Sequence, residues 1–213
     1  MLESTILHIR KSRLYNCSDS WRHRVSGNVL ELSVNAGETT DKPRYRCSVI
    51  TIGQVLKTLS DRIEANGSQY HIQSFPSLEN PEIIASIRTD SSGFSPKNPY
   101  FYKPEGNENE LPDKLLGILA IKYQFQLHPI PEETLPNEMR DPKIKNWFSL
   151  SSVFDNPFIW LNLGYMKEIF LHSKITQGNG NSLAFNDLCN LPDGRKPEIA
   201  LQEKLQLQAI AGV

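Results

Sequence analysis

One helical stripe dominates the residue pattern of this chain. Between Ser48 and Ala65, apolar side chains recur at steps of three, three, one, three and four residues, as on the buried face of an α-helix. They are Val49, Ile52, Val55, Leu56, Leu59 and Ile63. The following pair, Asn66 and Gly67, is a typical C-terminal stop, because glycine adopts the left-handed conformation without steric cost. We therefore expect a long buried helix over 48–65.

Strand patterns lie on both sides of this helix. In "WRHRV" (21–25) and "VLELSV" (29–34) alternate residues share a face, and the intervening "SGN" can turn the chain. We expect these segments to form a β-hairpin. "QYHIQSF" (69–75) predicts a further strand after the helix.

Four other segments predict helices. They are 2–14, which is short and amphipathic, 79–88 ("ENPEIIASIR") with Pro81 in its first turn, 112–125, and 156–174 as a second core helix. The C-terminal segment 191–210 opens with a turn and continues as an alternating run, which predicts a closing strand. No internal repeat is visible in the sequence.

Helices with few strands indicate an α+β fold, in which helices pack around a small, mainly antiparallel sheet. With 213 residues, of which 38% are hydrophobic, the chain suits a single domain over 1–213. A stretch at about 89–112 holds four prolines and few apolar residues besides aromatics such as Tyr100, Phe101 and Tyr102. It predicts a long loop, either a lid, an arm that reaches a partner, or a plain surface linker.

Composition excludes several classes of protein. The 23 basic and 24 acidic residues give a net charge of −1, without the basic surface that nucleic-acid binding needs. Apolar runs such as "GILAI" are too short to span a membrane. Residues 1–15 alternate apolar and charged side chains, unlike a signal peptide. We therefore expect a cytoplasmic protein that binds neither nucleic acid nor membrane.

Metal and nucleophile motifs are not found either. The three cysteines lack metal-ligand spacing and are expected to be reduced structural thiols. The five histidines are scattered, with no HExxH, so we expect no metal site. No set of Ser, His and Asp or of Cys and His can be assembled from their order, and the catalytic residues stay unassigned.

Several motifs, taken in order, resemble the nitroreductase superfamily. "NCSDSWRHRVSGNVLELSVN" (16–35) is similar to its N-x-Q-P-W segment followed by a strand, a turn and a second strand. The Acg-like branch continues with a G-D-x-L-E-L strand and then a basic residue before an I-S-C-G-A-x-L helix. Arg46, Ile50, Thr51 and Gly53 occupy the corresponding places here.

The second half of the chain continues the resemblance. "LAIKYQFQLHPIPEETL" (119–135) is similar to the A-I-x-x-R-x-T-x-R segment and V-P-x-E-x-L turn of that branch. "GRKPEIALQEK" (194–204) resembles its closing P-Q-x-x-L-R-x-G strand. The motifs thus touch most of the chain, each with only some of its positions matched.

The resemblance implies an α+β flavoenzyme fold in which two subunits, or two internal halves, enclose FMN. Such enzymes take hydride from NAD(P)H onto the flavin and pass electrons to small nitro, quinone or enone acceptors. It thus implies FMN as cofactor, NAD(P)H as reductant and a homodimer. The alternative is a degenerate family member without catalysis, which binds or stores flavin or serves as a partner-binding subunit.

The resemblance also implies flavin contacts at Asn16 and Ser18. Asn16 stands at the family Asn, where an amide can match the polar edge of the flavin. The family Gln-Pro is replaced, and Asp19 at the Gln position would only accept hydrogen bonds. The alternative role of Asn16 is to cap a turn, as asparagines commonly do.

Four cations are candidates for the flavin phosphate, which needs fixed positive donors. Lys122 lies near the first Arg of the A-I-x-x-R segment, and Lys204 lies close to the family's C-terminal Arg. Arg10 and Arg13, in "RKSR", resemble the R-R-S-x-R phosphate motif of other nitroreductases. Each cation has a plainer alternative, as an exposed helix lysine, an edge-strand lysine or a basic solvated helix face.

Overall fold

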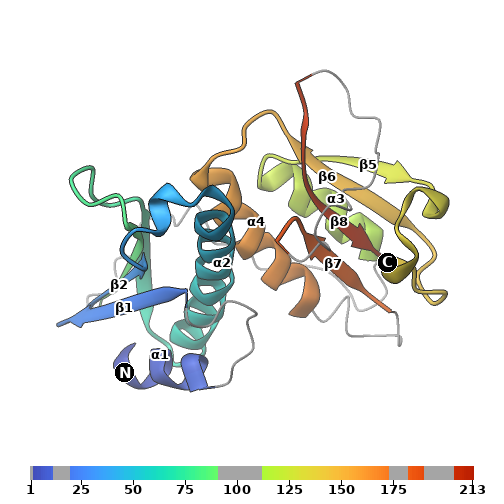
Figure 1. Cartoon of the computed structure of the whole chain (residues 1–213). Coiled ribbons are helices and arrows are strands. Elements are labelled where there is room, and N and C mark those ends of the chain that lie inside the picture. The colour runs from blue at the N-terminus through green and yellow to red at the C-terminus, as the bar shows by residue number, and fades with distance from the viewer. Residues whose placement is uncertain (1, 12–19, 91–111, 173–181, 190–203) are drawn as a thin grey trace. The chain divides into compact units, whose positions relative to one another are not determined.

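A computed structural model describes residues 2–11, 20–90, 112–172, 182–189 and 204–213 (Figure 1). By contacts, the chain divides into two compact units. The first comprises Met1–Lys103 and Trp160–Tyr165, and the second comprises Pro104–Ile159 and Met166–Val213. The single domain expected over 1–213 stays a prediction. The 89–112 loop falls almost entirely outside the described residues, between the end of one strand at Asp90 and the start of a helix at Pro112.

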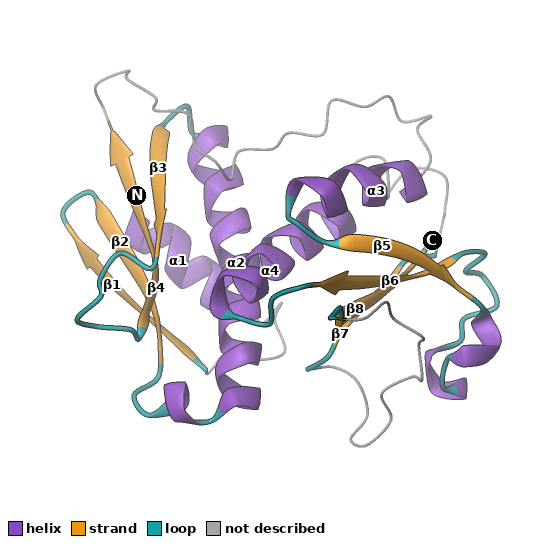
Figure 2. Cartoon of the chain, turned by 90° about the horizontal axis from the view of Figure 1, so that it is seen from above, coloured by secondary structure: helices purple, strands orange, loops and turns teal. Residues whose placement is uncertain are grey.

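The first unit is built from two helices and a four-stranded sheet (Figure 2). Its elements are α1 (Leu2–Lys11), β1 (Trp21–Ser26), β2 (Val29–Val34), the 3₁₀ turn η1 (Glu38–Thr40), α2 (Lys42–Ala65), β3 (Gln69–Ser74) and β4 (Ile83–Asp90). The strands lie in the order β1-β2-β4-β3 and all pair antiparallel. The predicted hairpin is confirmed as β1 and β2, with Gly27 at φ 60° in its turn.

Helix α2 confirms the predicted buried helix and begins six residues earlier than expected, at Lys42 instead of Ser48. The carboxylate of Asp41 accepts a hydrogen bond from the Arg44 amide (3.2 Å), which caps the helix. The helix ends at the predicted stop, where Gly67 has φ 72°. It packs against β2, β3 and β4, so its apolar stripe and the apolar face of the sheet form one core.

The helix predicted over 79–88 is wrong, because this segment forms strand β4. Pro81 precedes the strand instead of opening a helix. Ile84 and Ile87 are fully buried, and Ile87 lies between Leu30 of β2 and Ile72 of β3. A β-branched segment between two neighbouring strands gains more from sheet packing than from a short helix.

The second unit has the same kind of construction. Its elements are α3 (Pro112–Lys122), β5 (Gln126–Ile130), the 3₁₀ turns η2 (Glu132–Thr134) and η3 (Asn137–Met139), β6 (Trp147–Ser152), both ends of α4 (Pro157–His172), β7 (Ala184–Asp187) and β8 (Gln206–Gly212); the middle of α4, Trp160–Tyr165, groups with the first unit. The strand order is β5-β6-β8-β7, again antiparallel throughout. The segment between β5 and β6 folds over one face of this sheet, where Leu135 and Ile144 pack with Trp147 and Ile210.

The α+β class is confirmed, but the described residues form two small sheets instead of one. The helices predicted over 112–125 and 156–174 are confirmed as α3 and α4. The closing strand predicted within 191–210 is confirmed as β8 from Gln206 onward, and its part over 191–203 lies outside the described residues. Strand β5 was not predicted from the sequence. Strands β6 and β7 were not predicted. No helix in the described segments is long and apolar enough to cross a membrane.

Candidate functional site

Three of the six candidate flavin contacts are described. Asn16, Ser18 and Arg13 lie outside the described residues. Arg10 lies near the end of α1 in the first unit, whereas Lys122 and Lys204 belong to the second unit. The described part of the chain therefore tests the environment of three cations and of no amide contact.

Arg10 is engaged in packing α1 against β1. Its guanidinium donates to the Trp21 carbonyl (3.2 Å), lies 5.2 Å from the centroid of the Trp21 ring, and approaches Nδ1 of His23 (3.4 Å). Because arginine only donates hydrogen bonds, Nδ1 of His23 accepts here and the imidazole is neutral. Burial lowers the pKa of His23, and the nearby Arg10 charge lowers it further, whereas the Glu3 charge raises it. The Arg10 cation thus already has partners in its own fold.

Lys122 and Lys204 are both exposed. Lys122 is the last residue of α3, and its Nζ lies 5.9 Å from the centroid of the Tyr123 ring. Lys204 precedes β8 in a turn with φ 74°, a left-handed conformation that non-glycine residues adopt in only a few per cent of cases. Both ammonium groups can therefore reach a ligand from solvent, and both also fit the plainer role of solvated lysines.

Arg46, which matches the basic residue of the family motif, lies on α2 and is 8% exposed. Its guanidinium carbon lies 5.6 Å from the centroid of the Trp160 ring. The Tyr45 ring meets Trp160 edge-on, with centroids 5.8 Å apart, and burial raises the pKa of Tyr45. Trp160 belongs to the segment of α4 that groups with the first unit. From sequence we identified Arg46 only as a motif match, so its stacking on Trp160 was missed.

Gly53, the motif glycine, lies where α2 meets that same segment of α4. A Cβ atom added at Gly53 would lie 2.9 Å from the Tyr165 amide nitrogen and 3.1 Å from the Gly164 Cα. One added at Gly164 would lie 2.8 Å from the Ile50 carbonyl carbon. Backbone thus meets backbone at this crossing, and only glycine fits on either helix.

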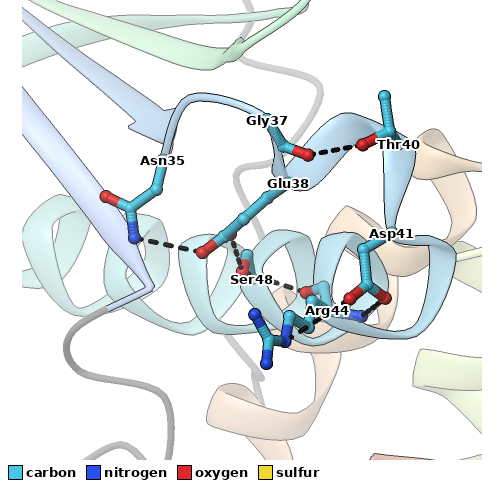
Figure 3. A network of polar contacts seen from close by, with 7 residues as sticks. All are labelled: Asn35, Gly37, Glu38, Thr40, Asp41, Arg44 and Ser48. Carbon is cyan, nitrogen blue, oxygen red and sulfur yellow. Dashed lines mark hydrogen bonds and ion pairs between the residues drawn. The ribbon is translucent and has the colours of Figure 1, made fainter.

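A polar network fixes the connection from β2 to α2 (Figure 3). The Glu38 carboxylate accepts from Asn35 Nδ2 (3.1 Å) and from Ser48 Oγ (2.7 Å), and Asp41 pairs with Arg44. Each Glu38 oxygen thus has a donor within the fold, so the role that the geometry supports is structural. Asp41 before Lys42 and Pro43 is a helix-start signal in the sequence, whereas nothing local indicates the Glu38 contacts.

The second unit contains a buried ion pair. Lys167 Nζ on α4 lies 2.8 Å from Asp187 Oδ2 at the end of β7, with side chains 10% and 3% exposed. Asp187 Oδ1 also accepts from the Cys189 amide (3.0 Å), and the Lys167 ammonium lies 5.9 Å from the Phe185 ring centroid. Sequence reasoning missed this pair, because its members are 20 residues apart on different elements.

Cys47 and Cys189 are disulfide-bonded, so the expectation of reduced thiols is wrong for these two cysteines. Sequence spacing carried no sign of this, because disulfide pairing depends on proximity in the fold. Cys17 lies outside the described residues. Within the described segments, no three or more His, Cys, Asp or Glu side chains gather in a group that could hold a metal ion.

Comparison with known proteins does not assign the chain to a family. No family model matches it, and no curated protein matches it. The resemblance to the nitroreductase superfamily therefore depends on the motifs in the sequence alone.

Proposed function

We propose that this protein is an FMN-dependent oxidoreductase of the nitroreductase superfamily. It takes hydride from NAD(P)H and reduces a small acceptor of the nitro, quinone or enone type. The observation that carries the proposal is the order of the family motifs along the chain, from the Asn16 segment to the C-terminal strand. Any one motif matches easily by chance, whereas several in the family order are harder to obtain.

The elements that carry these motifs agree with the proposal. The N-x-Q-P-W-like segment leads into the β1–β2 hairpin, and the helix motif lies on α2, with Gly53 at a backbone crossing. "IPEETL" (130–135) contains the turn η2, and the closing motif over 194–204 lies almost entirely outside the described residues. The α+β class agrees with the resemblance, whereas the described residues form two antiparallel sheets where one was expected.

The cations available suggest how FMN would be held. When bound, the flavin supplies the redox chemistry, and the protein supplies binding, orientation and electrostatics. Arg10 contacts Trp21 and His23 within the fold, and Lys122 contacts the Tyr123 ring, but the ammonium groups of Lys122 and Lys204 are exposed and would be the phosphate ligands. A lysine acts as a point charge and lacks the bidentate fork of arginine. Asn16 and Ser18 would contact the polar part of the flavin.

A second candidate function is a degenerate member that keeps the fold without catalysis. The engagement of Arg10 in packing favours it, together with Asp19 at the position of the family Gln. Such a protein would bind or store flavin without turnover, or bind a partner through the 89–112 loop. A single experiment separates it from the enzyme.

Two further parts belong to the proposal. The functional flavin site is formed by a homodimer or by two halves of one chain, as the resemblance implies. The location is cytoplasmic, and the disulfide state of Cys47 and Cys189 in cells tests this, because the cytosol keeps most thiols reduced.

The test is the visible spectrum of the purified full-length protein, before and after anaerobic addition of NADH or NADPH. A yellow protein that releases FMN on denaturation and is bleached by the nicotinamide supports the enzyme. Bound FMN that stays oxidised supports the non-catalytic member. A colourless protein whose thermal unfolding FMN does not shift would reject flavin binding altogether.

Flavin affinity then tests the cations. If each ammonium contacts the phosphate, Lys122→Ala and Lys204→Ala each lose about 1.5–3 kcal/mol, roughly a 10- to 100-fold rise in the Kd for FMN. Lys143→Ala is the matched control, since this exposed lysine lies in the same unit but outside every motif. Equal Kd values for all three variants would exclude both lysines as phosphate ligands.

A further inference from the structure

Two successive halves of the chain, α1 to β4 and α3 to β8, follow one plan. Each consists of a helix, two strands, a second helix and two further strands: α1-β1-β2-α2-β3-β4 in the first and α3-β5-β6-α4-β7-β8 in the second. In both sheets the second strand pairs with the first and the fourth, and the third lies at the edge beyond the fourth. All six pairings are antiparallel. One topology therefore occurs twice in this chain.

A local irregularity also recurs at the same place. The register between the second and fourth strands shifts once in each sheet, between Leu32 and Ser33 in β2 and between Leu150 and Ser151 in β6. Both shifts fall on a Leu-Ser pair, at the fourth and fifth residues of a six-residue strand. Bulges are specific features that families retain, so a shared bulge is stronger evidence of common origin than shared strand order.

The second helices of the two repeats carry equivalent glycines that meet one another. A Cβ atom on Gly53 would collide with the carbonyl oxygen of Leu161, three residues before Gly164. A Cβ atom on Gly164 would collide with the carbonyl oxygen of Ile50, three residues before Gly53. Such reciprocity, in which each member presents the same position to the other, is characteristic of an isologous interface between identical partners.

The repeats differ chiefly in their connections. β1 and β2 are joined by a tight turn at 27–28, whereas 131–146 joins β5 and β6 and covers one sheet face. Residues 12–20 lie between α1 and β1, whereas 123–125 join α3 and β5. Because loops accept insertions far more readily than paired strands, two copies of one unit are expected to diverge in this way.

We propose that the chain is a tandem duplication of one α-β-β-α-β-β unit, and that α2 and α4 form the self-complementary helix interface of the ancestral pair. The partner of the α2 surface around Gly53 is then its own counterpart, Gly164 of α4. The α2 surface is then covered within one chain, so we expect a monomer with two internal halves instead of a homodimer. The inference does not depend on flavin binding.

The first test is the molar mass of the full-length protein in solution, measured by light scattering across a dilution series. The expected result is a monomer of 24.2 kDa at every concentration. A stable dimer would overturn the inference. A monomer that binds no FMN rejects the proposed function alone, whereas a dimer that binds FMN rejects the inference alone.

The second test is a double-mutant cycle on the two glycines. Gly53→Ala and Gly164→Ala should each lower the Tm by several degrees, because either methyl separates the same two helices. The double variant should lose clearly less than the sum of the two shifts, since the first methyl has already opened the crossing. Gly117→Ala is the control, because nothing lies within 4 Å of a Cβ atom there. Fully additive shifts, or a Gly164→Ala variant as stable as the control, would reject the crossing.

Discussion

The buried ion pair between Lys167 and Asp187 offers the sharpest test of the packing in the second unit. Asp187→Asn keeps the size of the side chain but removes the negative charge 2.8 Å from the Lys167 ammonium. The side chains are only 10% and 3% exposed, so water cannot replace the lost partner without opening the fold. Breaking a buried pair from one side costs about 3–5 kcal/mol. For a chain of this length that corresponds to a Tm lowered by roughly 6–20 °C.

Urea unfolding followed by circular dichroism would measure this free energy, with Glu31→Gln as the matched control. Glu31 pairs with Arg24 at a similar distance (2.8 Å), but the Arg24 side chain is 74% exposed. An exposed pair contributes at most about 1 kcal/mol, so the control should unfold almost as the wild type does. A cost for Asp187→Asn no larger than that of the control would refute the reasoning.

The double variant Lys167→Met with Asp187→Leu separates the charge from the packing. Replacing a buried ion pair by apolar residues of similar size is often neutral or stabilising by about 1–4 kcal/mol, since both desolvation costs disappear. We expect the double variant to recover most of the stability lost by Asp187→Asn. Failure to recover would mean that the site depends on more than the paired charges, such as the bond from the Cys189 amide to Asp187.

Three further results are expected. Gly117→Ala should raise stability by about 0.5–1 kcal/mol, since alanine favours the helix and has open space there. Burial lowers the pKa of His23 below 6.5, so as the pH falls the unfolded chain binds a proton at this histidine at a higher pH than the folded chain does. The free energy of unfolding, measured with urea, should therefore decrease as the pH drops below 6.5. The decrease should be smaller in His23→Gln. In alkylation followed by mass spectrometry under native, non-reducing conditions, Cys47 and Cys189 should stay unlabelled until a reductant is added.

The elements that were predicted correctly are those whose sequence signals lie within the element itself. The buried stripe of α2 and the helix stop at Asn66-Gly67 were predicted correctly, because helix periodicity and capping depend on residues close together in the sequence. The β1–β2 hairpin was predicted for the same reason, through alternation and a tight turn at Gly27. β4 was misread because Pro81 and the residues after it suit a helix start, and only the neighbouring strands make the segment a strand.

The candidate site was less predictable, because its contacts join distant residues. The Arg10 guanidinium contacts Trp21 and His23 only because α1 packs against β1, which the sequence does not show. The stacking of Arg46 on Trp160 joins helices more than 100 residues apart in sequence. Residue types alone show that a cation is present, but not whether its own fold already uses it.

The duplication escaped sequence reasoning because the two halves share little more than what the shared fold requires. A Leu-Ser pair at each bulge and one glycine in each second helix are too few positions to detect as a repeat. Sheet order survives such divergence because it depends on alternation of apolar residues, which many sequences satisfy.

This division also indicates where a ligand site would arise. Both repeats share strand order, antiparallel pairing and the position of the bulge, so a function that only one repeat carries must come from segments that differ between them. The connection over 12–20, which contains Asn16 and Ser18, has only 123–125 as its counterpart. Two identical subunits would present this connection twice, whereas a duplicated chain presents it once. If flavin binds there, we expect one FMN per monomeric molecule, whereas a homodimer would bind two per assembly.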